Sequence, residues 1–150
     1  MDELQQLEEW VAPLLQAMEP GERMRLARTL GADLRRSQSQ RIHQQKDPDG
    51  SLYTPRKKQL RTRAGRIKRQ RMFLKLRQAK YLKVKASAEE VSVGFVGRVA
   101  RIARVHQQGE VDAVRPSGPR VRYERRVVLG FTAAERERVK YLLIDHLRGV

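Results

Sequence analysis

The chain has 150 residues, of which 33 are Lys or Arg and 17 are Asp or Glu, so its formal net charge is +16. This length suits one domain, and we expect a single domain over residues 1–150. The sequence contains no cysteine, which excludes disulfides, zinc ribbons and thiol catalysis. No apolar run approaches the about 20 residues that a membrane helix needs, so no membrane partner is expected. A surface this basic is expected to meet a negative partner.

The charge is unevenly distributed along the chain. Every charged residue in 1–22 is acidic, whereas residues 55–88 hold 14 basic residues and no acidic one. Like charges repel, so we predict a basic arm over 56–71 that is mobile in the free protein and orders on assembly. The acidic start and the basic middle also favour head-to-tail docking of identical copies. The residues expected to carry the interaction are the basic ones of this arm: Arg56, Lys57, Lys58, Arg61, Arg63, Arg66, Lys68, Arg69 and Arg71.

Apolar spacing predicts two helices in an N-terminal helical segment over 2–46. The first helix has apolar residues at steps of three or four: Leu4, Leu7, Val11, Leu14, Leu15 and Met18. Pro13 should bend or shorten it. Pro20 is well placed to open the second, longer helix. The last turns of that helix, residues 35–45, are almost wholly polar, so their inner face is expected to contact a partner or stay in water.

A turn signal follows the helical segment. Asp47-Pro48-Asp49-Gly50 supplies proline and glycine at the positions where a turn favours them. Leu52 and Tyr53 are expected to anchor this loop to the body of the protein. Residues 72–79 return to helical spacing, which predicts two to three helical turns.

Alternating apolar and polar residues then predict an antiparallel hairpin over 81–97. Its turn contains Glu89 and Glu90, which are interpreted as surface residues for solubility. A short helix is expected from residue 98 to Gly109, then a loop over 110–119. A third strand is predicted over 120–123, and residues 127–129 either extend it or form a fourth.

The last predicted element is a helix at the C-terminus. Thr132-Ala133-Ala134-Glu135 matches a capping box, in which the threonine hydroxyl accepts from a free backbone N–H. Together the elements predict an α+β fold: a small antiparallel sheet of three to four strands packed by helices, with an N-terminal helical pair and a C-terminal helix.

Sequence patterns that carry enzyme chemistry are missing. The three histidines lack metal-site spacing, and there is no serine elbow or phosphate-binding loop. We therefore predict no catalytic residue, no cofactor and no metal, and expect that the protein is not an enzyme. The basic arm lacks interleaved aromatic residues for base stacking, which leaves sequence-independent phosphate contact. One possible function is therefore that of a sequence-nonspecific nucleic-acid-binding protein.

Several strings together resemble the phage virion morphogenesis family, the tail-completion proteins of Mu-like contractile-tailed phages and prophages. They are Arg41-Ile42, the stretch from Asp47 to Arg56, the stretch from Gly94 to Ala103, His106-Gln107-Gln108-Gly109, and the stretch from Arg122 to Thr132. Their order and spacing match over nearly the whole chain. The family often has Trp where Tyr53 stands and Leu where Val128 stands, and both changes keep the packing role.

This resemblance implies a structural virion protein that completes the phage tail and joins it to the head. It implies a neck or tail-terminator ring, expected to number six copies, made in the bacterial host cytoplasm and present in the tail or neck of the virion. Its partners would be the tail tube, the head connector or both, with packaged DNA possible in the lumen. Whether the basic arm faces DNA or protein is left open.

Overall fold

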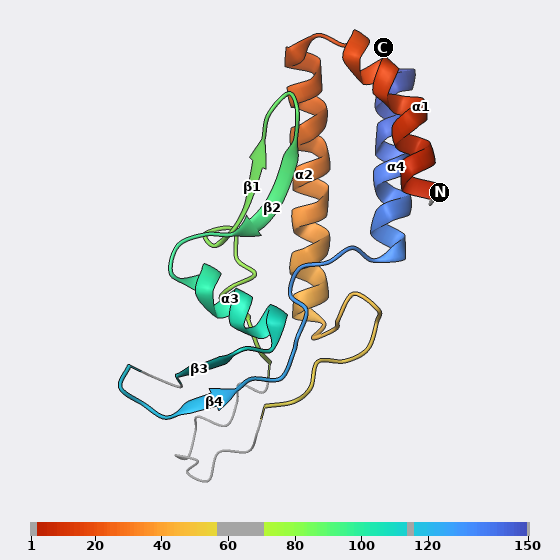
Figure 1. The fold of residues 1–150 in the computed structure, drawn as a ribbon. Helices are drawn as coiled ribbons and strands as arrows, with labels where there is room; N and C mark the ends of the chain where they lie inside the picture. The colour runs from red at the N-terminus through yellow and green to blue at the C-terminus, as the bar shows by residue number, and fades with distance from the viewer. Residues whose placement is uncertain (1–2, 57–70, 114–115, 150) are drawn as a thin grey trace. The chain divides into compact units, whose positions relative to one another are not determined.

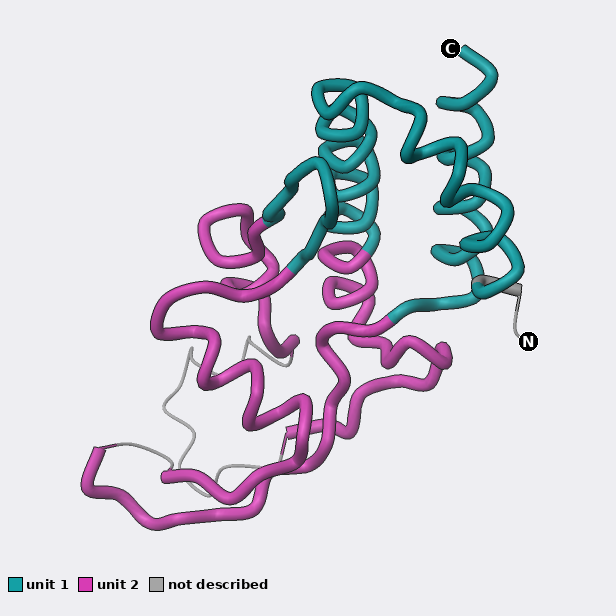
Figure 2. The backbone as a smooth tube through the Cα atoms, turned by 45° about the horizontal axis from the view of Figure 1, so that its top comes forward, with its two compact units in different colours: residues 1–37, 84–93, 131–150 teal, residues 38–83, 94–130 magenta. Residues whose placement is uncertain are grey.

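The computed structural model describes residues 3–56, 71–113 and 116–149 (Figure 1). Its elements follow in the order α1 (Glu3–Ala17), α2 (Pro20–His43), β1 (Leu82–Ala86), β2 (Val91–Phe95), α3 (Val99–Gln108), β3 (Val111–Ala113), β4 (Arg120–Arg122) and α4 (Ala133–Arg148). The predicted α+β class, with its N-terminal helical pair and C-terminal helix, is confirmed. The chain forms two compact units (Figure 2): residues 1–37, 84–93 and 131–150 in unit 1, and residues 38–83 and 94–130 in unit 2.

Helix α1 of unit 1 lies against α4 (Figure 1). Val11 is buried, as its place in the predicted apolar stripe requires. Leu14 is 42% exposed, so the prediction that it belongs to the buried stripe is wrong. The helix also continues through Pro13 to Ala17. Proline removes one backbone N–H from the hydrogen-bond ladder, and packing of the neighbouring turns offsets that loss.

The predicted hairpin forms as β1 and β2, and its residues in unit 1 pack closely on α2. The contact is at Gly31. A Cβ atom placed on this glycine would lie 2.9 Å from Cγ2 of Val91 and closer still to Cγ1 of Val84. Gly31 therefore lets both strands approach the backbone of α2.

Helix α4 begins with the predicted cap. The backbone N–H of Glu135 donates to Oγ1 of Thr132 at 3.0 Å, which confirms the first half of the capping box. The Glu135 carboxylate is buried, and its Oε1 accepts a hydrogen bond from the Ser37 hydroxyl at 2.9 Å. The residue thus ties the start of α4 to α2 within unit 1.

Substituting Thr132→Ala is expected to lower the free energy of unfolding by about 1 kcal/mol, because the Glu135 N–H loses its acceptor. Urea unfolding followed by circular dichroism measures this change. Thr29→Ala, an exposed threonine within α2, is the matched control and should change stability by less than about 0.5 kcal/mol. Equal effects of the two substitutions would argue against the cap.

The core of unit 2 gathers side chains that are far apart in the sequence: Ile42, Tyr53, Met72, Phe73, Leu76, Ala103 and Val128, with Phe95 and Val99 packed against them. The turn that precedes Tyr53 is as predicted, since Gly50 has a φ of 91° and its N–H donates to the Asp47 carbonyl at 2.9 Å. Tyr53 is buried, but Leu52 is 71% exposed and does not anchor the loop. Successive side chains of an extended segment point to opposite sides, so only one of the two can face the core.

Residues 74–77 form a turn, and the helix predicted over 72–79 is wrong. Phe73 has a φ of 66°, which an α-helix does not allow. The Gln45 side chain binds the Met72 backbone instead: the Met72 N–H donates to Oε1 at 2.7 Å, and Nε2 donates to the Met72 carbonyl at 2.8 Å. The apolar spacing in this segment therefore indicates which side chains are buried, and it does not indicate a helix.

Within the described residues, four strands form two antiparallel sheets of two strands each, rather than one sheet. Strand β3 lies in the segment 110–119, which was predicted as a loop, and it pairs with β4. Residues 127–129 form no strand. The Val127 N–H donates to Oδ1 of Asp47, and the next two N–H groups donate to Oε1 of Gln107, so side chains satisfy this backbone where a strand would otherwise do so.

Candidate interaction surfaces

The structure describes the two ends of the predicted basic arm. Arg56 and Arg71 are both exposed. Nη1 of Arg71 lies 3.3 Å from Nε2 of His43, and the charge of Arg56 acts on the His106 and Arg126 side chains. The remaining predicted interaction residues lie outside the described residues: Lys57, Lys58, Arg61, Arg63, Arg66, Lys68 and Arg69.

The positive charge is concentrated in unit 2. Counted from the sequence, unit 1 holds 10 basic and 12 acidic residues, a net charge of −2, whereas unit 2 holds 23 and 5, a net charge of +18. The described residues of unit 2 alone include 15 basic and 5 acidic ones. Unit 2 is therefore the part of the chain suited to a polyanion, and unit 1 is not.

A buried guanidinium holds the end of α2. Arg41 is 6% exposed, and its Nη1 donates to the carbonyls of Lys46 and Val127, both at 2.9 Å. Its Nη2 donates to the Val128 carbonyl at 2.9 Å and to Oε1 of Gln38 at 2.6 Å. The expectation that the inner face of this polar helix end contacts a partner or water is therefore wrong at Gln38 and Arg41, because both side chains bind within unit 2.

The same network fixes the segment that follows Val127. Gln38 Nε2 donates to the Gly130 carbonyl at 2.8 Å, and Gln107 Nε2 donates to the Leu129 carbonyl at 2.7 Å. The Tyr53 hydroxyl donates to the Val127 carbonyl at 3.1 Å, and burial raises the pKa of Tyr53 to about 12 although Arg41 lies nearby. These side chains serve the fold, so they are poor candidates for partner contact.

Sequence reasoning missed Gln38 and Arg41 as buried residues. A signal was available, because they continue the stripe of Leu30 and Leu34 at steps of four and three residues. Polar side chains continue the stripe because they face buried backbone carbonyl and N–H groups, which need hydrogen-bond partners.

His106 is enclosed by aromatic rings and an arginine. Its ring centroid lies 4.8 Å from that of Phe73 and 4.9 Å from that of Tyr123, and Nδ1 is 3.3 Å from Nη1 of Arg126. Burial, followed by the charge of Arg126, lowers the pKa of His106 to about 4. Arg126 is itself buried and donates from Nε to the Thr54 carbonyl at 2.7 Å. His106 is therefore neutral near pH 7.

Stability is expected to fall as the pH is lowered from about 6.5 to about 4. In that window the unfolded chain takes up a proton at residue 106 that the folded chain does not bind, so acid favours unfolding. Hydrogen bonding by Ser51 lowers the pKa of Asp49, and hydrogen bonding by the Ala113 N–H lowers that of Asp112. In the folded chain these two carboxylates therefore take up protons only below this pH window.

The measurement is the thermal unfolding midpoint at a series of pH values between 7 and 4. His106→Gln should flatten the decline in this window, whereas His146→Gln, which removes an imidazole from unit 1, serves as the control. An unchanged slope in His106→Gln would show that another group drives the decline.

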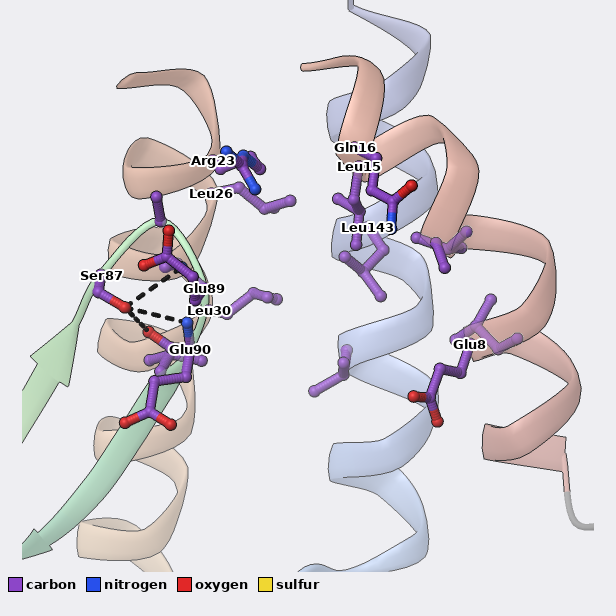
Figure 3. Close-up of a pocket in the computed structure, with 17 residues that line it drawn as sticks. Glu8, Leu15, Gln16, Arg23, Leu26, Leu30, Ser87, Glu89, Glu90 and Leu143 are labelled. Carbon is purple, nitrogen blue, oxygen red and sulfur yellow. Dashed lines mark hydrogen bonds between the residues drawn. The ribbon is translucent and has the colours of Figure 1, made fainter. Parts of the chain in front are cut away.

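Unit 1 contains an open pocket of about 550 Å³ (Figure 3). It is lined by residues of α1, α2, α4 and the turn between β1 and β2. Leu26 and Leu30 of α2 face the side that carries Leu15 of α1 and Leu143 of α4 (Figure 3). The lining is thus mostly apolar.

Carboxylates stand on two sides of this pocket: Glu8 on α1, and Glu89 and Glu90 in the hairpin turn (Figure 3). All three residues are exposed. None of them forms an ion pair with another described residue. We call this surface the acidic pocket.

Among the described residues, no group of three or more His, Cys, Asp or Glu side chains is placed to hold a metal ion. The described helices include none whose length and apolar character would allow it to cross a membrane.

Comparison with known proteins gives two consistent matches. The sequence profile of the phage virion morphogenesis family matches residues 2–148, which include both units. Tail completion protein S of Escherichia phage P2 is 37% identical over 149 residues, which cover 98% of this chain and 99% of that protein. No solved structure matches the chain significantly. The resemblance carried by the sequence strings is confirmed, and the chain belongs to the phage virion morphogenesis family.

Proposed function

We propose that this protein is a structural component of a phage virion that completes the tail and joins it to the head. It acts as a ring of identical copies at the neck, between the tail tube and the head connector, and makes or breaks no covalent bond. The observation that carries this proposal is the similarity to tail completion protein S over 98% of the chain. It is made in the bacterial host cytoplasm and ends in the tail or neck of the virion.

The separation of charge between the units supports self-association. Unit 1 carries a net charge of −2 and unit 2 one of +18, so a unit 1 surface of one copy attracts unit 2 of the next. When two different surfaces of the chain bind each other, successive copies form a ring if the rotations from one copy to the next add up to a full turn. In such a ring, the basic residues of unit 2 meet DNA phosphates in the lumen or an acidic neighbouring ring.

The direct test removes the protein from a phage or prophage that encodes it. Cells lacking it should accumulate DNA-filled heads and separate tails, and adding the purified protein to the lysate should restore joined, infectious particles. Negative-stain images and plaque counts measure both results. Complete and infectious particles formed without the protein would overturn the proposal.

Self-association is tested on the purified protein by light scattering over a range of concentrations. The expected mass is a multiple of the 17.4 kDa chain, and a ring of six copies gives six times that mass. A protein that stays monomeric at high concentration and never decorates the ends of tail tubes would contradict the ring.

The net charge of unit 2 favours a second candidate function, sequence-nonspecific binding to nucleic acid. Binding to duplex DNA of random sequence should then be tight at low salt and weaken steeply as salt is raised, because phosphate contacts release counterions. Such binding in a protein that tail assembly does not need would favour this function over the first.

A further inference from the structure

The acidic pocket has a shape and charge that define what fits it. Its interior is lined by leucines of three helices, and its rim carries Glu8, Glu89 and Glu90, against one lining guanidinium, that of Arg23, among the described residues. Burying apolar surface in the pocket would stabilise a complex, and unpaired carboxylates at the rim attract cations. A complementary surface therefore has an apolar centre flanked by basic side chains.

The two-stranded sheet of β3 and β4 presents such a surface in unit 2. The register pairs Val111 with Arg122 and Ala113 with Arg120, and residues directly opposite in an antiparallel pair share one face. This face, which we call the arginine face, therefore carries Val111 and Ala113 beside Arg120 and Arg122. All of β4 is exposed, and Val111 is 40% exposed.

The one acidic residue of this sheet is held on the opposite face. Asp112 pairs with Val121 in the register, so its side chain lies on the other side of the sheet from Arg120 and Arg122. Its Oδ1 accepts from Nη2 of Arg101 at 2.6 Å. The arginine face thus keeps its positive charge, and a sheet of only two strands gains stability when a partner covers it.

We propose that the arginine face of one copy docks in the acidic pocket of the next copy. Val111 and Ala113 would enter the apolar interior, while Arg120 and Arg122 would pair with Glu8, Glu89 and Glu90. A second copy is the occupant that the charges favour, because the pocket belongs to unit 1 and the arginine face to the strongly basic unit 2. The two surfaces differ, so repeated docking produces a ring or an open chain of copies. This inference rests on the self-association contained in the proposed function.

The experiment reverses the charge on each side separately. Variant A carries Glu89→Lys and Glu90→Lys, and variant B carries Arg120→Glu and Arg122→Glu. Each variant alone should be monomeric under conditions in which the wild-type protein associates, with association weakened at least about tenfold. All four positions are exposed, so circular dichroism and the unfolding midpoint should match those of the wild type.

An equimolar mixture of variants A and B should associate again, because each altered surface then meets a complementary one on the other variant. This recovery requires contact between copies, since it appears only on mixing. The control variant carries Arg28→Glu and Arg136→Glu, two exposed arginines of unit 1 outside both surfaces, and should associate like the wild type.

Three results of the association measurements would overturn the inference: wild-type association in variants A and B, a mixture that stays monomeric, or a wild-type protein that never associates. Loss of tail binding in variants that still self-associate would assign the pocket to another virion protein and would likewise reject a second copy as its occupant. Variants A and B that restore phage joining in full would reject these surfaces while leaving the proposed function intact. Infectious particles formed without any copy of the protein would instead reject that function.

Discussion

Replacing Arg41 by methionine is expected to lower the free energy of unfolding by about 4 kcal/mol. The guanidinium donates to the carbonyls of Lys46, Val127 and Val128 and to the Gln38 side chain. Methionine fills similar space but donates nothing, so the carbonyls of Lys46 and Val128 lose this donor, while the Val127 carbonyl keeps the Tyr53 hydroxyl. Each buried carbonyl left without a donor costs about 1–3 kcal/mol. For a chain of this length, the loss corresponds to a decrease of about 10 °C in the unfolding midpoint.

Two further variants separate the hydrogen bonds from the charge. Arg28→Met removes an exposed arginine from the same helix and should change stability by less than about 0.5 kcal/mol. Arg41→Lys keeps the positive charge but lacks the planar fork that reaches several acceptors at once, so it should recover only part of the loss. A methionine variant as stable as Arg28→Met would show that the network contributes nothing to stability.

Local sequence patterns were sufficient for the elements that depend on neighbouring residues. The threonine cap of α4, the turn at Gly50 and the hairpin of β1 and β2 were all predicted, because each follows from a spacing of a few residues. The end of α2 was misinterpreted for the opposite reason. Helical spacing continues the buried stripe to Arg41, but it does not show that the partners of this polar side chain are carbonyls more than 80 residues away in the chain.

The error at residues 72–79 has a related cause. The spacing of Met72 and Leu76 indicated a buried face, and both side chains are buried. The backbone is nevertheless set by Gln45, a residue of a distant segment that binds the Met72 N–H and carbonyl. Tertiary contacts therefore override the helical interpretation of the pattern.

The candidate surfaces were only partly accessible to sequence reasoning. The contrast between an acidic start and a basic middle predicted the charge separation now seen between the units. The acidic pocket was missed because Glu8 and the pair Glu89 and Glu90 are about 80 residues apart in the sequence and meet only around a pocket built from three helices and the hairpin turn. In the sequence, Glu89 and Glu90 cannot be distinguished from the polar residues of any solvent-exposed turn.

The second large effect is expected at Gly31, where Gly31→Ala should lower the free energy of unfolding by about 2–3 kcal/mol. Alanine is the better helix former by about 1 kcal/mol, so an open site in α2 would be stabilised by this change. Gly21 is such a site, because a Cβ atom there meets nothing within 4 Å. Gly21→Ala is therefore the matched control and should be neutral or stabilising.

A double-mutant cycle with Val84→Ala identifies the contact responsible. The added methyl group of Gly31→Ala would collide with Cγ1 of Val84 and would lie 2.9 Å from Cγ2 of Val91, and valine side chains have few χ1 rotamers available. Removing the Val84 methyl groups opens the space, so the double variant should lose less stability than the two single losses added together. Additive losses in urea unfolding would place the strain elsewhere. Because these valines belong to the two strands that are joined by the turn with Glu89 and Glu90, a shift of the hairpin in Gly31→Ala should also weaken self-association if the acidic pocket is the docking surface.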